Sequence, residues 1–175
     1  MAGPRLRKLA LTAHVVSSVG WLGAVAGFLA LAIAGLTSAD ALLVRGSYLA
    51  MEVLGWFVIV PLAGMSFATG LIQAWTTKWG LLQHYWVVIK LLMTIFATAV
   101  LVLHMRPVGL VADEAATSVL AGDDLNGLRV QLLADAAAAI LLLLVAATLS
   151  VFKPRGRTRY GWRKLGYGSG TDARK

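Results

Sequence analysis

Cysteine is absent from this chain of 175 residues, and there are only three histidines and eight acidic residues. Without cysteine the chain cannot form a disulfide framework, a thiolate metal site or an iron–sulfur cluster. A bare metal-ion site is not indicated either, because no two histidines stand four residues apart and the methionines are scattered. The chain also lacks GxSxG, HExxH, phosphate-loop and dinucleotide-binding patterns, so nothing points to nucleophilic catalysis or nucleotide binding.

Acidic residues are outnumbered by 16 lysines and arginines, which gives a formal net charge of +8. A basic chain can bind nucleic acid, but these cations gather at the two ends of the chain and do not follow one helix face. We therefore expect no nucleic-acid partner, and we attribute the charge to membrane topology.

Apolar residues make up 59% of the chain, and its mean hydropathy is +0.78. Soluble domains are roughly 45 to 50% apolar, so a soluble bundle of this size would leave large apolar patches in water. The sequence predicts an all-α integral membrane protein, a four-transmembrane up-and-down helix bundle. Its domain covers residues 1–152, with spans at about 9–36, 48–75, 85–105 and 132–152, followed by a basic tail at 153–175.

Three details of the spans are open to test. The first is too long for the apolar region of a signal peptide, so cleavage after Ala39 is the less favoured alternative. Pro61 is predicted to kink the second span. The connection at 106–131 is predicted to be a long acidic loop in which residues 113–121 form a short surface helix; its acids are Asp113, Glu114, Asp123 and Asp124.

Lysine and arginine placement predicts the orientation, because basic residues near span ends tend to stay in the cytoplasm. Three precede the first span and eight follow the fourth, whereas the two loops on the other side hold only Arg45, Arg106 and Arg129. Both termini are therefore predicted to be cytoplasmic. The tail is interpreted as a topology signal with a disordered end, or alternatively as a segment that docks on anionic lipid headgroups.

Ionisable side chains within a span cost at least ~2.5 kcal/mol at its centre on insertion scales, so each needs a reason. The predicted topology sorts them into two layers. The inner layer holds His14, His84 and Lys90, and the outer layer holds Glu52, His104, Arg106 and Asp135.

The inner layer is the richer of the two, because further polar residues recur at helical spacing near it. These are Ser17, Ser18 and Trp21 with His14, then Ser66, Thr69 and Gln73, and finally Thr94 with Lys90. Such an interior can hold a polar ligand, a propionate-bearing cofactor or water. In the alternative interpretation the hydroxyls only join helices, the GxxxG from Gly23 to Gly27 only lets backbones approach, and Lys90 and His84 reach the interface.

Two segments resemble a known family. They are HVVSSVGWLG, with His14, Trp21 and Gly23, and WVVIKL, which ends on Lys90 and Leu91 and is followed by His104. They are similar to small bacterial membrane proteins of the HemJ-type protoporphyrinogen oxidase and copper-resistance protein D kind, and most to uncharacterised relatives of these. The resemblance implies a four- or five-helix bundle in the bacterial inner membrane that binds b-type heme, with His14 as axial ligand and Lys90 as a functional residue of the pocket.

Three functions remain open at this point. In the first, the bundle binds heme for redox or heme-handling work; His14 and His84 are then the only histidines at one depth, because His84 and His104 stand about 30 Å apart on one helix. In the second, Glu52, His104 and Asp135 carry protons or ions. In the third, the chain is a non-catalytic membrane subunit that docks a partner or a second copy of itself.

Overall fold

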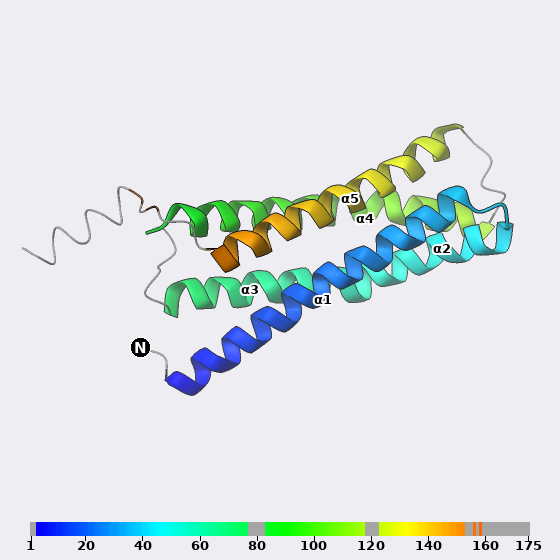
Figure 1. Cartoon of the computed structure of the whole chain (residues 1–175). Coiled ribbons are helices and arrows are strands. Elements are labelled where there is room, and N and C mark those ends of the chain that lie inside the picture. Colours follow the sequence, from blue (N-terminus) through cyan, green and yellow to red (C-terminus); the bar gives the residue numbers. More distant parts are fainter. Residues whose placement is uncertain (1–2, 77–82, 118–122, 153–155, 157, 159–175) are drawn as a thin grey trace, which may run out of the picture.

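The computed structural model describes residues 3–76, 83–117, 123–152, 156 and 158, which are almost entirely helical (Figure 1). The predicted all-α class is confirmed. Four helical rods are long and apolar enough to cross a membrane. The helices are α1 (Pro4–Thr37), α2 (Ala41–Leu54), the π-helical turn η1 (Gly55–Ile59), α3 (Val60–Thr76), α4 (Tyr85–Thr117) and α5 (Asp123–Phe152).

The rods run up and down in chain order, with α2, η1 and α3 forming one continuous rod (Figure 1). Helix α1 packs on α2, α3 and α5, and α4 packs on the same three helices, so α1 and α4 lie at opposite corners of the bundle. We call the end with Pro4, Thr76, Tyr85 and Phe152 the terminus end. The other end, with Thr37, Ala41, Thr117 and Asp123, is the far end.

The second rod departs from regular α-helix just before Pro61, where the sequence predicted a kink. Proline has no N–H to donate to the carbonyl four residues before it, and its ring crowds that carbonyl. The helix accommodates it with the π-turn η1 just before Pro61, in which the Val60 N–H donates to the Gly55 carbonyl. The side chain of Met105 fills the space where Gly55 has no Cβ.

The predicted long loop at 106–131 is wrong. Helix α4 continues through Pro107 to Thr117, and α5 begins at Asp123, so most of this segment is helical. The reason is packing, because the extension of α4 buries Val108, Val111 and Ala115 in the core. That apolar face outweighs the one hydrogen bond lost at Pro107. The first part of the predicted surface helix at 113–121 is thus the end of α4. Its remaining residues, 118–121, lie outside the described residues, and so does nearly all of the basic tail.

A buried clamp holds three helices at the far end. Tyr48 of α2 is 1% exposed, and its hydroxyl accepts a hydrogen bond from Arg129 Nε of α5 at 2.8 Å. The same guanidinium donates to the Gly35 carbonyl of α1 and lies over the Tyr48 ring, 5.3 Å from its centroid. Gly35 is required here, because a Cβ on it would stand 2.7 Å from Tyr48 Cζ.

The outer surface of the rods is apolar. Large side chains with more than half of their surface exposed occur on every rod, among them Leu9, Phe57, Phe96, Leu103, Leu141 and Val151. In the alternative interpretation, the GxxxG motif from Gly23 to Gly27 lets two backbones approach closely. No other part of the described chain makes such an approach at Gly23, since a Cβ there would meet nothing within 4 Å.

Replacing Gly35 with alanine should lower the free energy of unfolding by about 1 to 3 kcal/mol, because the new methyl collides with a ring that Arg129 holds in place. Gly23→Ala on the same helix is the matched control and should leave stability nearly unchanged. Unfolding titrations of both variants in mixed detergent micelles measure the difference. Equal stability of the two variants would contradict the clamp.

Candidate functional site

Two polar clusters face the bundle interior at different heights along α4. Lys90 and His104 stand fourteen residues, nearly four turns, apart on this helix, which is about 21 Å by helix rise. Lys90 meets α1 near the terminus end, and His104 meets α5 toward the far end. The sequence placed Lys90 in one polar layer with His14, and His104 in the other with Asp135. The contacts of Lys90 and His104 agree with that placement.

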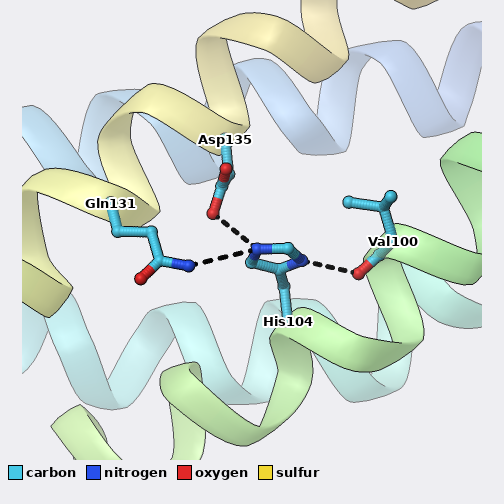
Figure 2. A network of polar contacts seen from close by, with 4 residues as sticks. All are labelled: Val100, His104, Gln131 and Asp135. Carbon is cyan, nitrogen blue, oxygen red and sulfur yellow. Dashed lines mark hydrogen bonds and ion pairs between the residues drawn. The ribbon is translucent and has the colours of Figure 1, made fainter.

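The far cluster is a histidine–aspartate pair between α4 and α5 (Figure 2). His104 Nε2 lies 2.9 Å from Asp135 Oδ2 and 3.3 Å from the Gln131 amide nitrogen. Its other ring nitrogen, Nδ1, lies 2.8 Å from the Val100 carbonyl. Gln131 and Asp135 stand four residues apart on α5, so they share one face of that helix.

Hydrogen-bond roles assign the tautomer of a neutral His104. A carbonyl only accepts, so His104 Nδ1 carries a proton and donates a hydrogen bond to the Val100 carbonyl. Nε2 then holds a lone pair, and the Gln131 amide N–H donates to it. Asp135 Oδ2 lies close to Nε2, is shielded from solvent and has no hydrogen-bond partner among the described residues. The cluster therefore contains one buried carboxyl oxygen that is open to a donor.

An apolar cavity of about 270 Å³ lies against this pair, between α1, η1, α4 and α5. Of the described residues in its wall, only His104 and Asp135 are ionisable. The remaining wall is aliphatic and aromatic, and it includes Trp21, Phe28, Phe96 and Ala139. The cavity thus has one polar end and is otherwise suited to apolar atoms.

The cavity also has a side facing outward from the bundle. Phe96 of α4 lines the cavity while 61% of its surface is exposed on the outside. Ala138 of α5, also in the wall, is exposed too. The wall between α4 and α5 is therefore one side chain thick at this height.

The cluster at the terminus end centres on His14. Its Nδ1 lies 3.0 Å from the Ser66 carbonyl and 3.2 Å from Thr69 Oγ1, both on α3. Beside it Ser18 and Ser66 hydroxyls pair at 2.7 Å. The ring packs on the α3 backbone, since a Cβ on Gly70 would stand 3.2 Å from His14 Cε1.

Lys90 reaches this histidine from the opposite corner of the bundle, with Nζ 3.4 Å from His14 Nε2. Because Nδ1 donates to the Ser66 carbonyl, Nε2 of a neutral ring carries a lone pair, and Lys90 donates to it. The hydrogen bond from Nδ1 to a carbonyl is the arrangement that also orients metal-binding histidines.

The structure joins some predicted site residues and separates others. His14 contacts Lys90, and Trp21 lies two turns further along α1 in the cavity wall. The hydrogen bonds found for the His14 ring among the described residues go to Ser66, Thr69 and Lys90, whereas His84 stands just before α4, where its carbonyl accepts from Val87. The structure therefore shows no histidine pair at that depth among the residues it describes.

The predicted outer trio is only partly assembled. His104 and Asp135 are paired, but no hydrogen bond or ion pair joins Glu52 to them in the described part of the chain. Glu52 instead lies toward α4 near Gly109, and Arg106 is exposed. Ion transport through the three residues stays a prediction. The sequence did not lead to Gln131, although the spacing of four residues between Gln131 and Asp135 would have indicated it. It did not lead to the cavity either.

In comparisons with known proteins, no family model, no curated protein and no solved structure matches this chain. Within the described residues, no three His, Asp or Glu side chains gather as a metal-binding group. The site therefore has to be interpreted from its own geometry.

Breaking the His104–Asp135 pair should lower the free energy of unfolding by nearly the same amount whether one or both partners are replaced. We expect His104→Gln and Asp135→Asn to show a coupling energy of about 1 to 3 kcal/mol in a double-mutant cycle of unfolding free energies. A second cycle between Asp135→Asn and Ser18→Ala, at the other cluster, should be additive. Additivity in the first cycle would show that the pair does not act as a unit.

Proposed function

We propose that this chain is a multi-pass membrane protein that binds a small lipid-soluble ligand with a polar head in the cavity beside His104 and Asp135. The observation that carries this proposal is the cavity itself, which is apolar except for His104 and Asp135 at its end. Ligand sites commonly have this composition, with few polar groups that set orientation in an apolar pocket.

Membrane placement is supported by the apolar outer surface and by the four rods of sufficient length. Water would have to cover exposed leucines, phenylalanines and valines on every rod, whereas lipid covers them without cost. The excess of basic residues at the two ends of the chain favours an orientation with both termini in the cytoplasm. By the family resemblance of the first and third spans, the membrane is the bacterial inner membrane.

The size and polarity of the cavity define the ligand class. A buried apolar cavity of about 150 Å³ takes up benzene, so about 270 Å³ fits a molecule of roughly two fused rings. A hydroxyl on that molecule would meet His104 and Asp135 and can donate to Asp135 Oδ2, which has no hydrogen-bond partner among the described residues. The thin wall at Phe96 provides a route from the bilayer between α4 and α5.

The ligand class can be tested with 2-naphthol and naphthalene, two probes of equal ring size of which only the first has a polar head. Titration of the purified chain in neutral detergent, followed by quenching of tryptophan fluorescence, should show that 2-naphthol binds about 10 to 100 times more tightly. Trp21, in the cavity wall, is a built-in reporter. His104→Gln should remove most of this preference and leave naphthalene binding nearly intact.

Filling the cavity provides a matched pair of variants. Ala139→Phe places a ring in the cavity and should abolish binding of both probes, whereas Ala134→Phe, on an exposed face of the same helix outside the cavity wall, should not. Binding that survives Ala139→Phe, or equal affinity for the two probes, would overturn the proposal.

Heme is the second candidate, and one observation favours it. His14 donates from Nδ1 to the Ser66 carbonyl, which leaves Nε2 with a lone pair for iron. Lys90 holds that nitrogen, so it would have to turn away, and its ammonium would then be free to pair with a propionate. The chemistry that heme supplies when bound is one-electron transfer. The far pair does not fit iron, because both ring nitrogens of His104 are engaged.

Heme binding predicts that hemin titrated into the purified chain shows a Soret band shifted from that of free hemin in the same detergent, because axial ligation by imidazole shifts the heme absorption. His14→Ala should abolish the shift, and His104→Ala should leave it. A shift that persists in His14→Ala, or no shift in the wild type, would exclude His14 as a heme ligand.

A further inference from the structure

We propose that Lys90 binds a phosphate-type anion at the terminus end of the bundle, between α1, α3 and α4, where His14 holds the ammonium until the anion replaces it. The site rests on the membrane placement proposed above but does not depend on the ligand of the cavity. The hydrogen bonds of Lys90 are its first support. An ammonium has three donors, and among the described residues one of them is used, by His14 Nε2.

Among the described residues, no carboxylate balances the charge of Lys90. The sequence contains no Asp or Glu from residue 1 to 39, from 53 to 112 or from 136 to 171. Consequently every rod lacks a carboxylate in its half toward the terminus end, apart from Asp172 of the tail, which lies outside the described residues. Asp113, the next acid along α4, stands about 35 Å away by helix rise.

The position of Lys90 favours an anion from the bilayer surface. It lies five residues into α4, about 8 Å along the helix from Tyr85. A lysine at this depth usually extends to the interface. Here the half-buried side chain instead crosses toward α1, where a neutral imidazole meets it. Its charge is thus held toward the inside of the bundle, about one and a half turns of α4 from the terminus end.

The surroundings suit a phosphate oxygen. Lysine is a common phosphate ligand because its ammonium acts as a compact point charge with rotatable donors. An oxyanion that replaces His14 Nε2 at Nζ would receive charge-assisted hydrogen bonds, which are about twice as strong as those between neutral groups. Such an anion can come from a phospholipid head group or from free phosphate, and the two sources share this chemistry.

The test uses the full chain, purified in dodecyl maltoside and titrated with dioleoylphosphatidylglycerol, dioleoylphosphatidylcholine or sodium phosphate. Bound lipid is counted by native mass spectrometry, and the unfolding temperature is recorded in parallel. We expect phosphatidylglycerol to bind and raise the unfolding temperature, and Lys90→Gln to weaken that binding at least tenfold. Lys8→Gln, an exposed lysine at the same end, is the matched control and should bind like the wild type.

Each outcome decides the proposal. Lys90-dependent binding of sodium phosphate would identify a soluble anion as the source, and binding of phosphatidylglycerol alone would identify the lipid. Lys90→Arg keeps the cation and should keep the site, which guards against a folding defect in Lys90→Gln. Equal lipid binding by the wild type and Lys90→Gln would overturn the site, whereas unchanged 2-naphthol binding in Lys90→Gln would show that the cavity is separate from it.

Discussion

The apolar outer surface of the four rods is the constraint on which the rest of the structure depends. With leucine, valine and phenylalanine side chains exposed on every rod, the surroundings that this surface suits are lipid. Lipid offers no hydrogen bonds, so helices satisfy their own backbone groups and polar side chains at depth have to find partners on neighbouring rods. Four ionisable residues follow this rule at two heights along α4, where Lys90 meets His14 and His104 meets Asp135.

The two clusters differ in a way that separates their roles. The far pair contains a histidine and an aspartate in close contact, and it lies at the polar end of an apolar cavity. The cluster at the terminus end contains a cation and an imidazole, with no acid beside them among the described residues. A buried carboxyl oxygen without a partner accepts a hydrogen bond from a ligand, whereas a cation without a counter-charge attracts an anion.

Sequence reasoning reached the class of fold and the grouping of the polar residues, because both follow from hydrophobic periodicity and from depth along a span. His104 and Asp135 were placed in one layer, as were His14 and Lys90, and each pair is in contact. The end of α4 was missed, because Pro107 and the acids after it resemble a loop while the burial of Val108 and Val111 appears only when the rods are packed. The cavity was missed for a similar reason, since the space left between side chains depends on their mutual packing and not on spacing along one helix.

Whether lipid surrounds the rods can be measured directly by washing membranes from cells that express the chain with alkaline carbonate, which releases peripheral and soluble proteins but leaves integral ones in place. If the apolar surface faces lipid, the chain stays in the membrane pellet and enters solution only when detergent is added. Recovery of the folded chain in the carbonate supernatant without detergent would contradict membrane insertion.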